Sequence, residues 1–180
     1  MSLPARLRAY AAHPDALTAG CNRIALLVAS SQPTYPLYVA WLAGGSWWVA
    51  CVTFLSTPCF IAVPALARRH ATAGRALLVV TGVGNAMLAS MALGVGSGVE
   101  LFLIPTLLIT LLAFRKAPRV MIALIALHAV VGLMHGHYGL AWAAIPKPGR
   151  GPLLHLNASS AAILSLIIAS TLITPSSARR

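Results

Sequence analysis

Long apolar runs, separated by short connections rich in glycine, proline or basic residues, dominate the hydropathy pattern of this chain. A transmembrane helix needs about 20 mostly apolar residues, and six runs reach or approach that length. They cover residues 24–43, 47–66, 76–95, 99–114, 120–138 and 153–174. Membrane β-strands would instead give alternating segments of about ten residues. The pattern therefore predicts an all-α polytopic membrane protein, a bundle of six transmembrane helices.

The segments outside these runs complete the domain organisation. Residues 1–23 are not apolar enough to span a membrane and are expected to form a cytoplasmic arm. Apolar side chains recur in this arm at helical spacing beside Arg6 and Arg8, which fits either a short interfacial helix or a frayed tail. Residues 175–180 are expected to form a cytoplasmic tail.

Composition supports the membrane class. Of the 180 residues, 59% are hydrophobic and only 8% are charged, whereas a soluble domain averages about 25% charged residues. The net charge of +11 raises the possibility of a nucleic-acid partner. The basic residues, however, lie in short connections between apolar runs and not on one soluble face. We therefore expect the lipid bilayer, and no nucleic acid, as the partner.

The basic residues also predict an orientation. Eleven of the thirteen Lys and Arg residues fall in the arm, the second connection, the fourth connection and the tail. The first and third connections carry none, and the fifth carries two. Because basic loops stay cytoplasmic, both termini are expected in the cytoplasm, with the protein in the inner membrane. Four tryptophans lie at the opposite boundary, at headgroup depth: Trp41, Trp47, Trp48 and Trp142.

The centre of the first run is polar and contains two prolines, in residues 30–36. Irregular backbone at membrane depth is tolerated only where it is buried in protein or lines a cavity. The segment is therefore either a kinked helix whose polar groups are satisfied locally or one wall of a ligand pocket. Asn85, central in the third run, is the expected partner of Gln32.

Acidic residues are too few and too far apart to suggest catalysis. Asp15 lies in the cytoplasmic arm and Glu100 lies at the outer end of the fourth run, so paired-carboxylate chemistry is not expected. No carboxylate lies deep in the membrane, where a proton relay or cation carrier would need one. Phosphate-binding, hydrolase and dinucleotide-binding motifs are also missing from the sequence. We do not expect an enzyme.

Histidines form the only chemical cluster in the sequence. His128 and His135 share a face of the fifth run, about 10 Å apart along a helix axis. His137 and His155 fall at the same outer end, level with Glu100. Imidazole and carboxylate suit a metal, at His135, His137 and His155, and imidazole can also ligate haem or a pigment. Because the spacing matches no strong motif, no cofactor is predicted, and a ligand-facing polar network or plain interfacial histidines are the other interpretations.

Two stretches resemble segments of a known class of receptors. Residues 97–105 (SGVELFLIP), running to a basic 114–116, are similar to the fourth-span region of six-helix sensor modules. These modules precede bacterial histidine kinases and class III adenylate or guanylate cyclases. Residues 35–41 (YPLYVAW) resemble a Pro-Leu-Tyr-Tyr segment in the first span of quorum-sensing kinase receptors. The resemblance implies a bacterial six-helix sensor. Because those receptors continue into an output domain and this chain ends at Arg180, it would act on a partner protein.

These observations favour a membrane sensor or interaction module. We expect it to bind a small apolar or amphipathic ligand and to couple to a membrane or cytoplasmic partner protein, or to a second copy of itself. One alternative is an accessory subunit of a redox or photosynthetic membrane complex, with a His-ligated cofactor. A second alternative is a small facilitator. The expected ligand-binding side chains are Gln32, Tyr35, Asn85, Glu100, His128, His135 and Asn157.

Overall fold

The computed structural model of the chain describes residues 2–44, 47–138, 141–142, 145 and 147–173. Every secondary-structure element in these residues is helical, so the all-α prediction is confirmed. The elements, including short 3-10 helices labelled η, are α1 (Leu3–Ala11), α2 (Ala16–Ser31), η1 (Gln32–Thr34), α3 (Tyr35–Ala43), η2 (Trp47–Ser56), α4 (Thr57–Arg69), α5 (Ala71–Leu93), η3 (Val95–Ser97), η4 (Val99–Phe102), α6 (Leu103–Ala113), α7 (Pro118–Leu133) and α8 (Lys147–Ile173).

Three helical stretches in the described residues are long and apolar enough to cross a membrane. They are Trp47–Arg69, Ala71–Leu93 and Pro148–Ile173. A helix of 23 residues, the length of the first two, measures about 35 Å, against a hydrocarbon core of about 30 Å. Val99–Ala113 and Pro118–Leu133 are apolar but shorter. These lengths support a membrane-embedded protein.

Several ends of the predicted runs differ from the helices. α2 begins at Ala16, inside the predicted arm and before residue 24, and α5 begins at Ala71, before residue 76. α7 stops at Leu133, and the following turns include Gly136 at a φ of +75°, so the predicted end at residue 138 was too late. α8 begins at Lys147, before the predicted start at residue 153. Pro148 lies in its first turn, where a missing N–H breaks no helical hydrogen bond. The predicted tail, 175–180, lies outside the described residues.

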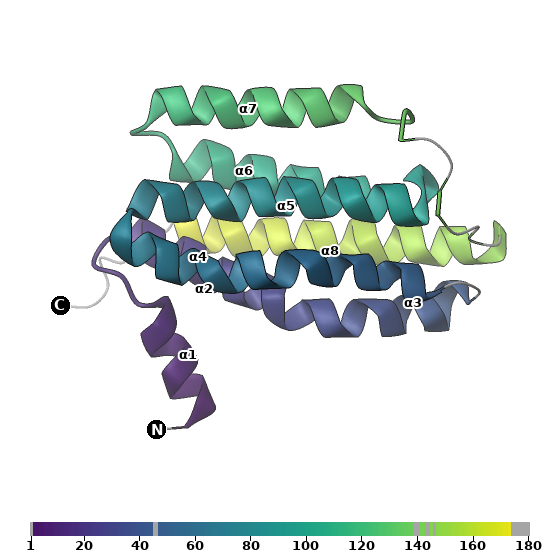
Figure 1. Cartoon of the computed structure of the whole chain (residues 1–180), viewed down its shortest axis with the longest axis horizontal. Helices are drawn as coiled ribbons and strands as arrows, with labels where there is room; N and C mark the ends of the chain where they lie inside the picture. The colour runs from purple at the N-terminus through teal and green to yellow at the C-terminus, as the bar shows by residue number, and fades with distance from the viewer. Residues whose placement is uncertain (1, 45–46, 139–140, 143–144, 146, 174–180) are drawn as a thin grey trace.

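The prolines of the first run do not unwind it. Pro33 and Pro36 lie in the first turns of η1 and α3, so α2, η1 and α3 follow one another as a nearly continuous rod (Figure 1). Nearby hydroxyls bond backbone carbonyls of the preceding turn. Ser31 Oγ donates to Val28 O at 2.8 Å, and Thr34 Oγ1 donates to Ser31 O at 2.7 Å. Local satisfaction of the polar groups, one of the two interpretations of this segment, is therefore observed.

The rod and helices α4 to α8 run roughly side by side (Figure 1). α7 lies at the edge of the bundle and packs against α5 and α6, while α8 packs against α6, α3 and α2. The start of α2 and the end of α8 lie at the same end of the bundle. An added Cβ at Gly20 would come within 2.8 Å of Leu172 Cδ2.

The arm is helical and anchored to that same end. Tyr10 of α1 donates a hydrogen bond to Ile61 O at 2.9 Å, and the Arg68 guanidinium carbon lies 4.7 Å from the centre of the Tyr10 ring. Asp15 caps the N-terminus of α2 by accepting from Thr18 N at 3.1 Å. Partial burial opposes ionisation of Asp15, but the hydrogen bonds from Thr18 outweigh it and lower the pKa of this carboxyl.

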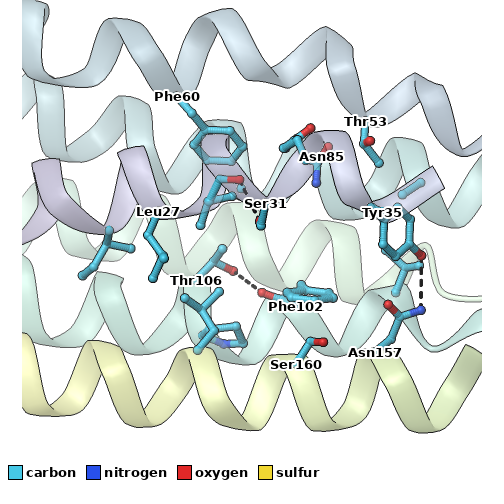
Figure 2. A pocket seen from close by; sticks show the side chains of 18 of the residues that line it. Leu27, Ser31, Tyr35, Thr53, Phe60, Asn85, Phe102, Thr106, Asn157 and Ser160 are labelled. Atoms are coloured by element: carbon cyan, nitrogen blue, oxygen red, sulfur yellow. Dashed lines mark hydrogen bonds between the residues drawn. The ribbon is translucent and has the colours of Figure 1, made fainter. Parts of the chain in front are cut away.

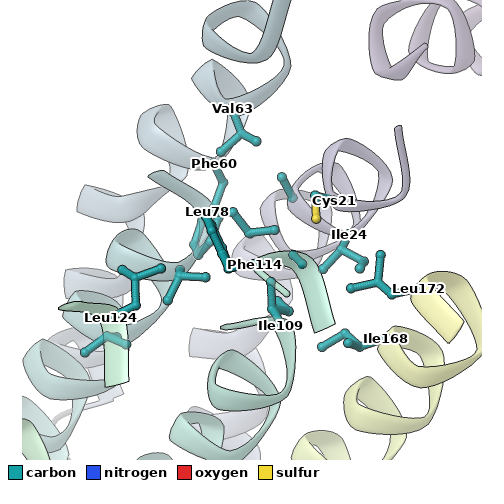
Figure 3. Packing of buried hydrophobic residues seen from close by; sticks show 14 of the residues in the cluster. Cys21, Ile24, Phe60, Val63, Leu78, Ile109, Phe114, Leu124, Ile168 and Leu172 are labelled. Atoms are coloured by element: carbon teal, nitrogen blue, oxygen red, sulfur yellow. The ribbon is translucent and has the colours of Figure 1, made fainter. Parts of the chain in front are cut away.

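Two clusters of buried apolar side chains fill the bundle. The larger includes Cys21, Phe60, Phe114 and Ile168 and joins α2, α4, α5, α6, α7 and α8 (Figure 3). The second joins α3, η2, α5 and α8 around residues such as Leu153. The space between these clusters is only partly filled.

Candidate ligand-binding cavity

A cavity of about 320 Å³ lies inside the bundle. Its walls come from the α2–η1–α3 rod, α5, η4, α6 and α8, with single contributions from η2 and α4 (Figure 2). Ile24 and Phe60, from the larger apolar cluster, line it together with Ala89 and Val99 from the second. The cavity is therefore positioned by the incomplete packing between the two clusters.

The structure brings together four of the seven expected ligand-binding residues. Gln32, Tyr35, Asn85 and Asn157 all line the cavity, although they come from η1, α3, α5 and α8. Central positions in their apolar runs were the signal for Gln32 and Asn85, whereas Asn157 lies near the start of its run. Glu100, His128 and His135 do not line it.

Gln32 and Asn85 are connected, but not by the direct contact expected from the sequence. Gln32 Nε2 donates to Ser56 Oγ at 2.9 Å, and Ser56 Oγ lies 2.8 Å from Asn85 Oδ1. Thr57 Oγ1 donates to Gln32 Oε1 at 3.2 Å. The bridging residue, Ser56, was missed. A hydroxyl inside an otherwise apolar run was the signal available for it.

A second polar group joins α8 to α3 and to η3, the short helix that ends at Ser97. Asn157 Nδ2 donates to Ser97 O at 2.8 Å and to Tyr35 Oη at 3.3 Å (Figure 2). Asn157 is only 1% exposed, so this contact replaces solvation that its amide loses on burial. The amide nitrogen thereby fixes three elements at one end of the cavity.

His128 lies one layer behind the cavity wall. Its Nε2 is 3.0 Å from Thr106 Oγ1, a cavity-lining hydroxyl, and its Nδ1 is 2.7 Å from Leu124 O. His128 does not line this cavity, because α7 packs behind α6 and α5. Both imidazole nitrogens have hydrogen-bond partners, which leaves neither free to ligate a cofactor in this arrangement.

Glu100 and His135 form a separate pair outside the cavity. Glu100 Oε2 is hydrogen-bonded to His135 Nδ1, while Glu100 Oε1 is buried without a partner among the described residues. Tyr138 lies beside them and donates to Val131 O at 3.2 Å. Partial burial and the Glu100 carboxylate raise the pKa of Tyr138 to about 12. The two residues expected in the ligand pocket thus belong to another polar site.

The other outer histidines do not join this pair. His137 Nδ1 contacts the backbone carbonyl of His135 at 2.9 Å, and His155 is exposed on α8. Within the described part of the chain, no three His, Cys, Asp or Glu side chains are grouped as a metal site requires. The three histidines expected to bind a metal, His135, His137 and His155, are thus not brought together among the described residues, and a metal bound by them stays a prediction.

Comparison of the chain with protein-family models, with curated proteins and with solved structures gave no match.

Proposed function

We propose that this protein is an integral membrane sensor or interaction module that binds a small amphipathic ligand in the bundle cavity. The cavity itself carries the proposal. It has the size and mostly apolar lining typical of small-molecule sites, and a few polar groups converge on it. Four of those groups, Gln32, Tyr35, Asn85 and Asn157, come from three regions that are far apart in the sequence: the α2–η1–α3 rod, α5 and α8.

The proposal takes the bundle as six membrane crossings, with both termini in the cytoplasm and the protein in the inner membrane. α2–η1–α3 is the first crossing, and the shorter helices of residues 99–113 and 118–133 are the fourth and fifth. An even number of crossings fits the start of α2 and the end of α8 lying at one end of the bundle. The distribution of basic residues supports the cytoplasmic assignment.

Coupling to a partner would run through Asn157. A ligand near this amide competes with or reinforces the contacts that hold α8 against α3 and Ser97. A shift of α8 would be transmitted to the cytoplasmic end of the bundle and read there by a partner protein or a second copy of the chain. This is the behaviour implied by the resemblance to six-helix sensor modules.

The cofactor-binding alternative has less support, because both nitrogens of His128 are engaged and His135 pairs with Glu100. Absorbance of the purified protein tests it directly. A Soret or pigment band would favour that alternative over the sensor proposal.

The ligand proposal is tested by extracting small molecules from protein purified from native membrane and identifying them by mass spectrometry. Ser160 lines the cavity, while its neighbour Ser159 is exposed on α8 and does not. We expect a compound enriched with the wild type and Ser159→Phe and lost with Ser160→Phe, because only the second ring fills the cavity. Identical extracts from the two variants would contradict the proposal.

The orientation is tested with a membrane-impermeant maleimide on intact cells, in a background without the native cysteines. His137 and Lys116 are both exposed. We expect His137→Cys to be labelled from outside and Lys116→Cys only after lysis. The reverse pattern would invert the topology.

A further inference from the structure

The cavity excludes charge from its lining. No Asp, Glu, Lys, Arg or His side chain lines it in the described part of the chain. Burying an ion away from water without a partner costs several kcal/mol even after relaxation. An occupant that brings a charge into this space would find no counter-ion, so an uncharged occupant is favoured.

The lining changes character along the bundle axis. Ile24 lies eleven residues before Tyr35 along the rod, and Ile167 lies ten residues after Asn157 along α8. Because the rod and α8 run in opposite directions (Figure 1), Ile24 and Ile167 lie toward one end of the cavity and Tyr35 and Asn157 toward the other. From Asn157 to Ile167, ten residues of α8 rise about 15 Å. The cavity therefore extends along the bundle axis, apolar at one end and polar at the other, and this shape favours an elongated occupant.

The polar end holds hydrogen-bonding groups that the protein leaves unused. Tyr35 Oη accepts from Asn157 Nδ2, and its own proton has no acceptor among the described residues. Asn157 Oδ1 has no donor there, and Figure 2 shows it pointing toward Phe102 and the cavity. A donor and an acceptor thus stand next to each other, as a hydroxyl or a primary amide would require.

The cavity opens sideways. Five of its lining residues are exposed, and all lie on the α2–η1–α3 rod or on α8: Leu27, Ser31, Thr34, Tyr38 and Ile163. The lining residues of α5, η4 and α6 are buried or half-buried. The opening therefore lies between the rod and α8, at mid-length of both, where a spanning bundle faces lipid.

We infer that the cavity binds an uncharged single-chain amphiphile that enters from the bilayer between the rod and α8. Its hydroxyl or amide end lies at Tyr35 and Asn157, and its chain lies toward Ile24 and Ile167. This inference rests on the proposed ligand-binding function and adds the chemical class, the orientation and the route of the ligand.

Photolabelling in nanodiscs of neutral phospholipid tests the chemical class. The probes are a ten-carbon alcohol with a diazirine near its chain end, and the matching carboxylate and quaternary ammonium, with 1-decanol as competitor. We expect saturable labelling by the alcohol that maps to peptides around Ile24 and Ile167. The two charged probes should need at least tenfold higher concentration. Tyr35→Phe removes one hydrogen bond, so the alcohol concentration that gives half-maximal labelling should rise roughly two- to tenfold.

The entry route is tested by the rate of labelling. Ile163→Trp places a large ring at the opening, whereas Leu166→Trp places the same ring on an exposed part of α8 that does not line the cavity. We expect Ile163→Trp to slow labelling severalfold and Leu166→Trp to leave it unchanged. Equal rates for the two variants would refute entry through this gap.

The outcomes separate this inference from the function it rests on. Saturable cavity labelling by the charged probes at the same concentration as the alcohol would overturn the uncharged class and leave ligand binding standing. If none of the three probes labels the cavity saturably, the inference fails. If Ser160→Phe and Ser159→Phe also give identical labelling and identical extracts, the proposed function fails as well.

Discussion

Gly74 allows α4 and α5 to approach each other directly after a one-residue connection, His70. A Cβ added at Gly74 would lie 2.6 Å from both Cα and Cβ of Ala67 and 2.8 Å from its backbone nitrogen. Carbon atoms pack at about 3.5–4.0 Å. No flexible side chain can move aside, so Gly74→Ala must push the two helices about 1 Å apart.

The magnitude follows from a matched control on the same helix. Gly84 has no atom within 4 Å of an added Cβ. Both alanines gain helix propensity, worth about 1 kcal/mol at most, but only Gly74→Ala introduces overpacking, which typically costs about 1–3 kcal/mol. Gly74→Ala should therefore unfold with a free energy about 1–3 kcal/mol lower than Gly84→Ala.

Thermal unfolding in mild detergent, followed by circular dichroism, measures this difference. Each kcal/mol corresponds to about 2–4 °C in Tm for a chain of this size. Gly84→Ala should unfold at or slightly above the wild-type temperature and Gly74→Ala below it. Equal Tm values for the two variants would refute the close approach of α4 and α5 at Gly74.

Three further predictions concern the polar groups outside the cavity. Asp15→Ala should destabilise the protein by about 1 kcal/mol through loss of the α2 cap, while Asp15→Asn should cost little. Folding lowers the pKa of Asp15, so the stabilisation from its ionised carboxylate is complete above its ordinary pKa near 3.9 and is lost as pH falls through the lower folded-state pKa. The free energy of unfolding should therefore change less between neutral and acid pH in Asp15→Asn than in the wild type. The pKa of Tyr138 is raised to about 12, so its phenol should still be neutral at pH 11. Tyr138→Phe should therefore not reduce the phenolate absorbance at that pH. The stabilisation from the neutral Tyr138 phenol is complete below pH about 10 and is lost as pH rises toward 12. Glu100→Gln should lower this pKa part of the way, and an unchanged titration would show that burial acts alone. In a double-mutant cycle, Glu100→Gln and His135→Ala should couple by about 0.5–1 kcal/mol, whereas His135→Ala and His155→Ala should be additive; strong coupling of the two histidines would mean that they share a site.

The first apolar run shows how far the sequence could be interpreted. Two prolines and several hydroxyls in residues 30–36 indicated either local satisfaction or a cavity wall. Both are observed, because all four polar side chains line the cavity but differ in their hydrogen-bond partners. Ser31 and Thr34 bond their own helix, while Gln32 and Tyr35 reach across to other helices. The sequence pattern does not show which partner each polar side chain takes.

The histidines show where interpretation of the sequence was not sufficient. Seven-residue spacing predicts that His128 and His135 share one face of the fifth run, but α7 ends at Leu133 and His135 lies in the turn that follows. The two side chains therefore meet different neighbours. His128 meets Thr106 on α6, and His135 meets Glu100 on η4. Ser56 and Ser97 complete the two polar groups at the cavity, and nothing in the sequence pointed to those contacts. Their roles depend on which helices lie beside them.

The sequence by itself determined the membrane class, the helical content and the approximate position of each apolar helix. Those properties depend on the transfer of each segment from water to lipid and on local backbone bonding, and both are summed along the chain. The tertiary structure decided which polar groups meet, that α7 lies outside the cavity wall, and that a neutral, laterally open space remains between two apolar clusters. These features depend on how each helix is rotated and how closely the helices pack. Small residues such as Gly20, Gly74 and Gly82 allow close packing. A helix that is apolar on every face has no hydropathy pattern that shows which face points inward.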